Sequence, residues 1–439
     1  MKKIAKKIIT SILRREASAV LRKYKPKIVA VIGSVGKTST KDAIYSVFSQ
    51  EFFVRKSEKS FNSDIGIPLT VLGCGNGWND PVIWLQNIFS GLRLLVQKQK
   101  YPEWLILEIG VDRPGDMKSA AGWIKPDILV VTRFADVPVH VENFSSPEAL
   151  IAEKSLMITA LKKDGVLVLN ADDEKVLALK SKWNGKIKTY GFNEKADIRG
   201  SHLSIMYGED DIERKFPTGT ILRLNVGDTS VPARIFGTLG KTSGYGAMAT
   251  AAASLSAGIN LVKISEGLSL IVPPPGRMRL ITGIKRSLIL DDSYNASPVA
   301  MKSALETLKE VATYGRKFAV LGDMLELGKY STDEHKKAGA LAKDSCDVLV
   351  TVGVRARNIA EGALDNGMDE NNIYQFESSR EAGKYLEKLI GDGDIVLVKG
   401  SQGSGTNKIR MEQAVEEIMA EPEKAGELLV RQGEEWKVK

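Results

Sequence analysis

Short blocks of Val, Ile and Leu alternate with glycine-rich or polar stretches along most of the chain, an order that predicts strand, turn and helix in repetition. Each block is almost wholly apolar, which is typical of strands buried on both faces of a parallel sheet. We therefore predict an α/β protein with a mostly parallel central sheet and helices on both faces. The clearest expected strands begin the segments 27–41, 104–117, 127–134, 166–173, 287–298, 317–324, 347–353 and 394–401.

Three regions depart from this rhythm. Residues 186–236 contain short alternating runs split by Gly, Pro and Asp, which predict a small antiparallel insertion. Residues 74–90 are rich in Gly, Asn and Trp, and we expect an irregular excursion there. The proline-rich segment 272–281 is the best candidate for a domain boundary. The predicted parts are residues 1–26, a basic amphipathic helix; 27–276, a P-loop-type central domain; and 277–439, a Rossmann-like α/β domain.

The first 25 residues predict a helix, with Ile4, Ile8 and Ile12 on one stripe and Lys and Arg around them. No apolar core of signal-peptide length follows the lysines, so we expect no cleavage or export. Such a helix can lie on an anionic membrane surface. It can equally pack against the protein's own body or a second copy, and both interpretations stay open at this point.

Positive charge is concentrated in that helix. The chain has 62 Lys and Arg against 54 Asp and Glu, but ten of the basic residues and only one acid lie within residues 1–27. The remaining 412 residues carry 52 basic and 53 acidic side chains, so a nucleic-acid groove is not expected. The two cysteines, Cys74 and Cys346, lie in no metal-ligand spacing, and we expect a reducing, cytoplasmic compartment.

The segment KIVAVIGSVGKTSTK (27–41) predicts a strand, a phosphate loop and a helix. Gly33 and Gly36 allow the backbone N–H groups to face phosphate oxygens, Lys37 can reach the β- and γ-phosphates, and the Thr38 hydroxyl can bind Mg²⁺. The usual first glycine of the longer motif is replaced by Val31, so the match is to the short form GxxGK[ST]. The alternative is a plain glycine turn of an α/β protein.

Two further side chains are candidates for metal binding. Glu108 ends an apolar strand, where a buried carboxylate needs a partner or a metal, although a satisfied structural glutamate is an equal alternative. His140 is one of three histidines, and a single histidine is more often structural than a ligand. Downstream, a helix capped by Ser146 is expected to carry Glu153 and Lys154.

Several motifs, in their order along residues 27–420, together resemble the Mur ligase family. The most specific are DDSYNASP (291–298), VLGDMLELG (320–328) with His335 after it, and VLVKGS (396–401). The phosphate loop, NSDIGIPLT (62–70), LEIG (107–110) and HVENF (140–144) agree with them.

The resemblance implies an ATP-dependent peptide ligase of cell-wall precursor synthesis, most similar to the member that adds D-alanyl-D-alanine to a UDP-muramoyl-tripeptide. The implied cofactors are ATP and two Mg²⁺ ions, with Lys154 carbamylated. The implied partners are a UDP-muramoyl-peptide and a D-amino-acid dipeptide, and we expect a monomer. A peptide carboxylate would attack the γ-phosphate, and the dipeptide amine would then displace phosphate from the acyl phosphate.

The resemblance also assigns roles to individual residues. The implied metal ligands are Thr38, Glu108, His140 and Lys154. The implied nucleotide-binding residues are Gly33, Ser34, Val35, Gly36, Lys37, Thr38, Ser39, Arg277, Asp292, Tyr294 and Asn295. The implied catalytic residues are Lys37, Glu108, His140, Lys154 and Arg277.

Two departures from the family pattern bear on these expectations. Only about 26 residues precede the first strand, so the family's separate UDP-binding domain is expected to be missing. The family's HNxxN pattern falls on Thr242, Ser243 and Gly246, which puts adenine recognition in doubt. Alternatives are therefore a ligase with a different acceptor, either lipid-linked or polyglutamate-like, and a non-ligating, membrane-associated ATP-binding regulator.

Overall fold

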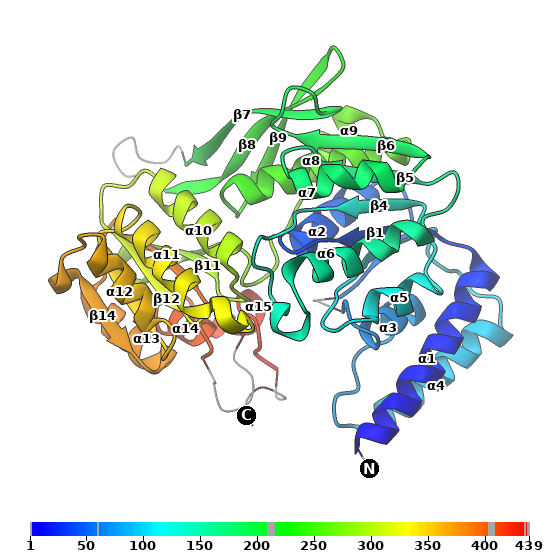
Figure 1. Cartoon of the computed structure of the whole chain (residues 1–439), viewed down its shortest axis with the longest axis horizontal. Coiled ribbons are helices and arrows are strands. Elements are labelled where there is room, and N and C mark those ends of the chain that lie inside the picture. The colour runs from blue at the N-terminus through cyan, green and yellow to red at the C-terminus, as the bar shows by residue number, and fades with distance from the viewer. Residues whose placement is uncertain (1, 59–60, 209–215, 403–408, 434–435, 437–439) are drawn as a thin grey trace.

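The computed structural model describes residues 2–58, 61–208, 216–402, 409–433 and 436, and the side chains from residue 7 onward within them. It contains two sheets that lie side by side, each flanked by helices (Figure 1). The predicted α/β class, with a mostly parallel sheet and a second α/β unit, is confirmed.

The first sheet has nine strands in the order β2-β3-β1-β4-β5-β6-β7-β8-β9. Pairing is parallel from β2 to β7 and antiparallel between β7, β8 and β9. The predicted antiparallel insertion therefore extends the parallel sheet at one edge. The strands are β1 (Lys27–Ile32), β2 (Val54–Lys56), β3 (Trp104–Glu108), β4 (Ile128–Val131), β5 (Val166–Asn170), β6 (Lys186–Gly191), β7 (Ile198–Tyr207), β8 (Pro217–Val226) and β9 (Thr229–Phe236).

Successive side chains of β1 point to opposite faces and belong to two separate cores. Ile28, Ala30 and Ile32 pack with α1, α3, α5 and α6, whereas Val29 and Val31 pack with α2, α8 and α9. The helices are α1 (Lys2–Tyr24), α2 (Lys37–Phe48), α3 (Gly66–Leu72), α4 (Pro81–Val96), α5 (Asp116–Ala121), α6 (Pro147–Ser155), α7 (Glu174–Leu177), α8 (Lys241–Ser256) and α9 (Leu261–Ser269).

The second sheet has six strands in the order β10-β11-β15-β12-β13-β14, parallel except for β10. Its strands are β10 (Arg279–Thr282), β11 (Leu288–Asp292), β12 (Lys317–Gly322), β13 (Val348–Val352), β14 (Ile373–Phe376) and β15 (Ile395–Lys399). Its helices are α10 (Pro298–Glu310), α11 (Ser331–Lys343), α12 (Arg357–Asp365), α13 (Ser379–Leu389), α14 (Glu412–Ile418) and α15 (Ala425–Leu428). Short 3₁₀ helices lie at Val141–Asn143, Leu156–Ala160, Ala178–Lys182, Ile284–Arg286, Gly328–Tyr330, Glu370–Asn372 and Pro422–Lys424.

The two units meet where the chain passes from the first sheet to the second. Leu239 is buried in the core of the second sheet, and the Thr242 hydroxyl of α8 lies 3.0 Å from the Ser303 hydroxyl of α10. An isolated bridge pairs Thr238 with Arg279. The carboxyl ends of β1 and β11 therefore face a shared boundary, and the exact division at residue 277 stays a prediction.

The first helix packs on the protein's own body. Leu13, Ala17 and Val20 of α1 are fully buried against α3 and α4, while Ile8 is exposed and the side chain of Ile4 lies outside the described residues. The predicted helix is confirmed; its buried face is formed by Leu13, Ala17 and Val20, while Ile12 of the predicted stripe is half-buried. No described helix is long and apolar enough to cross a membrane.

The expected irregular excursion over residues 74–90 is wrong in its second half, where α4 begins at Pro81. Asp80 caps this helix by accepting a hydrogen bond from the Val82 N–H at 2.8 Å, and proline is favoured at the first helical position. The sequence Asp80-Pro81 is a helix N-terminus signal, but the Gly, Asn and Trp residues before it favoured an irregular prediction.

The α1–α4 contact contains a buried carboxyl, and this generates a pH-dependent prediction. Burial raises the pKa of Glu16 from 4.5 to about 7, so the folded state is increasingly destabilised as the pH rises from about 4.5 to 7. We expect Glu16→Gln to raise the free energy of unfolding by about 1 to 2 kcal/mol at pH 8, allowing for solvent screening, and by little at pH 4.5. Urea unfolding of both proteins at the two pH values measures this, and an equal gain at both would contradict it.

Candidate nucleotide site between the two sheets

The phosphate loop follows β1 and opens α2. Gly36 caps α2 with φ 83°, and Gly33 has φ 141° with so little room that a Cβ would lie 2.0 Å from Thr132 Oγ1. The Ser34 N–H donates to the carbonyl of Arg133 at 2.7 Å, which ties the loop to the end of β4. These constraints hold the loop in a shape whose free N–H groups face the cavity, as phosphate binding requires.

Behind the loop, Glu108 at the end of β3 joins it through a short hydrogen-bond chain. The Thr38 hydroxyl donates to Glu108 Oε2 at 2.8 Å, and Asn62 Nδ2 donates to Glu108 Oε1 at 3.0 Å. Register explains the meeting, because Val31 of β1 pairs with Glu108 in the parallel ladder. Asn62 was not predicted as a site residue, although its motif, NSDIGIPLT, was part of the resemblance.

Lys154 of α6 reaches the same loop, and its Nζ donates to the Ser34 hydroxyl at 3.1 Å. Burial, and then the nearby charge of Lys37, lower the pKa of Lys154 to about 7. Burial also lowers the pKa of Lys37, which the carboxylate of Glu108 partly offsets. Two lysine side chains with lowered pKa values therefore lie beside one loop. A bound anion would raise both pKa values and favour the charged forms.

His140 lies where the two units touch, with φ 70° just before the 3₁₀ helix Val141–Asn143. Its Nε2 is 3.3 Å from Asp112 Oδ1, and its Nδ1 is 2.7 Å from Glu326 Oε2 of the second unit. The hydrogen bond from His140 lowers the pKa of Glu326. Across the described residues, no three His, Cys, Asp or Glu side chains form a metal cluster, so ligation by His140 would require release of a carboxylate.

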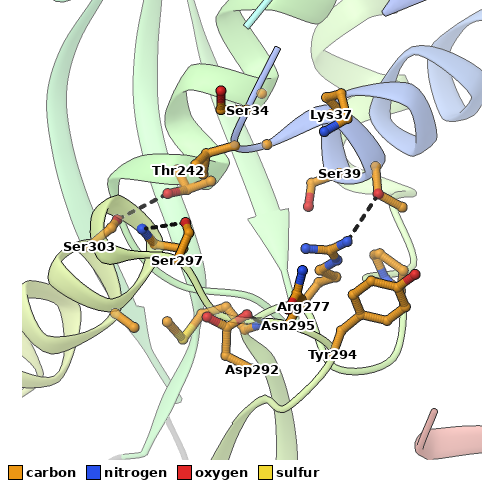
Figure 2. A pocket seen from close by; sticks show the side chains of 18 of the residues that line it. Ser34, Lys37, Ser39, Thr242, Arg277, Asp292, Tyr294, Asn295, Ser297 and Ser303 are labelled. Atoms are coloured by element: carbon orange, nitrogen blue, oxygen red, sulfur yellow. Dashed lines mark hydrogen bonds between the residues drawn. The ribbon is translucent and has the colours of Figure 1, made fainter. Parts of the chain in front are cut away.

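Arg277 enters from the crossing between the two units, and Figure 2 shows its guanidinium directed at the first turn of α2. Its NH2 group donates to Thr38 Oγ1 at 3.3 Å, and its guanidinium carbon is 4.1 Å from the centre of the Tyr294 ring. The turn before it depends on Gly276, with φ 69°, where a Cβ would lie 2.8 Å from the Tyr294 nitrogen. The Arg277 Nε is buried and has no partner within the described residues.

The second unit contributes the loop after β11. Asp292 Oδ2 accepts from buried Lys399 at 2.6 Å, and Lys399 also donates to the Asn295 carbonyl at 3.0 Å. The Asn295 side chain accepts from the Ala296 N–H at 2.9 Å. Lys399 was missed by sequence reasoning; its presence in the VLVKGS motif was the available signal, and only the pairing of β15 with β11 shows that it meets Asp292.

These side chains line one cavity of about 400 Å³ between the two sheets. It brings together every residue predicted for the site except Gly33, which shapes the loop from behind. Polar lining residues that were not assigned a role include Asn62, Asp112, Ser297, Ser303, Lys399 and Gln402.

The expected adenine side of the cavity lies at the start of α8. Thr242 shares a hydrogen bond with Ser303, and the Ser243 hydroxyl donates to the Gly240 carbonyl at 2.7 Å. Gly246 lies buried on the cavity wall, and a Cβ there would contact only Thr40 Oγ1, at 3.8 Å. The wall therefore has room at residue 246, where the family pattern has an asparagine.

The residues present fit a nucleoside triphosphate with Mg²⁺. A hydroxyl and a carboxylate, those of Thr38 and Glu108, are oxygen donors of the kind Mg²⁺ prefers. The unpartnered Arg277 Nε suits a phosphate oxygen, and Gly36 leaves room beside the loop, since a Cβ there would meet only Thr242 Cγ2, at 3.8 Å.

Two family models match the chain: the Mur ligase middle domain over residues 86–254 and the Mur ligase glutamate ligase domain over residues 276–402. The chain belongs to the Mur ligase family. This Mur ligase is 29% identical over 411 residues to the UDP-N-acetylmuramoyl-tripeptide--D-alanyl-D-alanine ligase of Bacillus subtilis, covering 93% of this chain and 79% of that protein. The ligase of the same name from Escherichia coli is 27% identical over 401 residues, covering 90% and 78%.

The fold of this Mur ligase is similar to that of solved family members. The crystal structure of MurF ligase from Thermotoga maritima in complex with ADP gives a TM-score of 0.73 at 23% identity, covering 95% of this chain and 84% of that one. At this identity the likeness supports the shared arrangement of two sheets.

The position of Arg277 generates a binding prediction. We expect Arg277→Ala to raise the dissociation constant of MgATP by about tenfold or more, because a charge-assisted hydrogen bond to phosphate is lost. Titration calorimetry measures the change. Arg357→Ala is the matched control, since Arg357 lies on the surface of the second unit and pairs with Glu377; equal affinities of the two variants would contradict the assignment.

Proposed function

We propose that this Mur ligase joins D-alanyl-D-alanine to a UDP-muramoyl-tripeptide in an ATP-dependent reaction that passes through an acyl phosphate. The observation that supports this most is the convergence of Lys37, Lys154 and Arg277 on one cavity with the Thr38–Glu108 pair. The names of the relatives from B. subtilis and E. coli give the same reaction for those proteins.

The proposed chemistry needs charge neutralisation more than a nucleophile on the protein. In the first step a peptide carboxylate attacks the γ-phosphate, the bond from that phosphorus to the β-bridging oxygen breaks, and ADP leaves. In the second step the uncharged amine of the dipeptide attacks the acyl carbon, loses a proton and displaces phosphate. Lys37 and Arg277 would hold the phosphate oxygens while two anions approach each other.

We further propose that ATP is held by the loop from Gly33 to Ser39 and, across the cavity, by Arg277 and the loop carrying Asp292, Tyr294 and Asn295. Thr38, Glu108, His140 and Lys154 would hold Mg²⁺, which supplies charge stabilisation when bound. Because these groups belong to two units, closure of the units would assemble the site and exclude water from the acyl phosphate.

Carbamylation of Lys154 is part of this proposal. Only a neutral amine adds to CO₂, and a pKa of about 7 leaves much of Lys154 neutral near physiological pH. Its nitrogen adjoins the Ser34 hydroxyl at the phosphate loop, so a carbamate there would place a carboxylate-like group beside the proposed metal site.

For location, we propose a cytoplasmic monomer with a peripheral contact to the membrane through its N-terminal region. The cytoplasm contains the ATP that the reaction consumes. The basic character of residues 1–27 supports the membrane contact.

Phosphate release from ATP and Mg²⁺ tests the reaction, with UDP-muramoyl-tripeptide and D-alanyl-D-alanine each present or absent. We expect release to depend on both substrates and the product mass to correspond to a pentapeptide. Tight ATP binding without turnover would overturn the proposed soluble acceptor and favour a lipid-linked one. No ATP binding would overturn the nucleotide site and make Gly246 the central departure.

Loss of Lys37 tests the role of the phosphate loop. We expect Lys37→Ala to lower phosphate release about 100-fold or more, because charge stabilisation of the transferred phosphoryl group is lost. Lys263→Ala is a matched control, since Lys263 of α9 pairs with Glu51, which follows the end of α2, and neither lines the cavity. Activity of Lys37→Ala close to that of the control would contradict the assignment.

Loss of Lys154 tests the carbamate. We expect Lys154→Ala to lower turnover about 100-fold or more and a small carboxylate such as acetate to restore part of it. Carbon-13 NMR of the unmodified enzyme in labelled bicarbonate should show a carbamate signal that Lys154→Ala lacks. Full activity of Lys154→Ala would contradict the ligase proposal as a whole.

A further inference from the structure

An apolar stripe runs along the outer side of α4. Val82, Leu85, Phe89, Leu92 and Val96 follow one another at spacings of three and four residues, which places them in one line over the helix. Each is between 44% and 83% exposed. Exposed apolar residues are ordinary when scattered, but a continuous line of five marks a contact surface.

The opposite side of α4 is firmly packed, so the stripe belongs to a well-positioned helix. Asn87, Gly91 and Leu94 are buried, and a Cβ on Gly91 would lie 2.3 Å from the Glu16 carboxylate of α1. Lys23 Nζ of α1 donates to the carbonyls of Leu94, Leu95 and Gln97 at 2.8 to 2.9 Å and satisfies the end of α4. The packing of α1 against the opposite side of α4 thus fixes the orientation of α4 and leaves the stripe exposed to solvent.

The charges close to the stripe are mostly basic, and within residues 80–102 the one acid is Asp80, which caps α4 beside Val82. Residues 81–102 contain Arg93, Lys98 and Lys100 and no acidic residue, and all three basic side chains are exposed. The neighbouring α1 brings most of the ten basic residues of 1–27, and the single acid there, Glu16, is buried. Two copies meeting through this stripe would bring two cationic faces together, which disfavours self-association. An anionic surface complements the same charges.

We propose that the stripe on α4, flanked by the basic residues of α1 and α4, docks the enzyme on an anionic lipid membrane. The five apolar side chains would enter the boundary between headgroups and acyl chains, and the Lys and Arg side chains would contact lipid phosphates. This inference rests on the peripheral contact proposed above and assigns its apolar part to α4. Within the described side chains, α1 buries Leu13, Ala17 and Val20 against α3 and α4, whereas α4 exposes a continuous apolar line.

The location of the docking surface is compatible with catalysis. Figure 1 places α1 and α4 at the edge of the molecule away from the second sheet, and neither contributes a residue to the cavity. The second unit therefore stays free to close over the cavity while the first is docked. The arrangement would bring the ligase to precursors that are used at the membrane.

Vesicle flotation of the full-length protein tests the proposal, with phosphatidylcholine vesicles and with vesicles that also contain phosphatidylglycerol. We expect binding to the anionic vesicles that weakens at high salt. Leu85→Gln/Phe89→Gln/Leu92→Gln should lower the partition coefficient about tenfold or more, since three apolar contacts are lost. Lys98→Gln/Lys100→Gln should lower binding to the anionic vesicles selectively.

The matched control is Val262→Gln/Val354→Gln/Leu364→Gln, which alters three apolar side chains that are 40% to 61% exposed elsewhere on the surface. We expect it to bind vesicles as the unmodified protein does. Circular dichroism checks that each variant folds; if the α4 variant does not, loss of binding by the Lys98/Lys100 variant alone carries the test.

Three results would overturn the proposal: no vesicle binding by the unmodified protein, equal binding by the α4 variant, or a dimer that the α4 variant abolishes without any vesicle binding. The last result would assign the stripe to a second copy. Turnover of soluble substrates without vesicles is measured in parallel. Vesicle binding and turnover are independent measurements. If the ligase proposal fails, the vesicle result still tests docking, and if docking fails, turnover still tests the ligase proposal.

Discussion

The burial of two lysine ammonium groups, those of Lys37 and Lys154, beside the phosphate loop is the constraint on which the rest of the site depends. Burial lowers the pKa of both Lys37 and Lys154, and the charge of Lys37 lowers the pKa of Lys154 further. Arg277 adds a third cation from the crossing segment, with its Nε buried. Such a cluster is unfavourable alone and favourable around a polyphosphate, so its presence makes the cavity selective for highly charged anions.

Part of the backbone strain is found at the same boundary, where three of the nine described non-glycine residues with positive φ lie. His140, Met278 and Glu326 have positive φ values although none is glycine, and all three lie where the first unit meets the second. Residues in this region of conformational space are retained where surrounding contacts require them, commonly at functional sites. The contact of His140 with Glu326 and the turn around Met278 thus couple the relative position of the two units to the geometry of the cavity.

The α1–α4 pair lies away from the cavity, but both regions place side chains in an unfavourable environment. In the cavity, cationic groups are shielded from water, and a bound anion would stabilise them. On α4, apolar side chains are exposed to water, and an apolar phase would stabilise them. Glu16 lies between the two helices, so close that a Cβ on Gly91 would lie 2.3 Å from its carboxylate, and this burial raises its pKa. The ligase thus has a cavity lined by charged groups between its sheets and a separate exposed apolar stripe at its edge.

The sequence by itself determined the strands, the loop 33–39 and the helix carrying Lys154, because apolar periodicity and capping residues are local signals. It could not show that Lys399 neutralises Asp292, or that both His140 nitrogens contact carboxylates, since those pairs are distant in the chain. Nor could it decide which side of α1 is buried or that α4 exposes its apolar side. Those outcomes depend on which surfaces the other elements cover, and only the tertiary structure decides that.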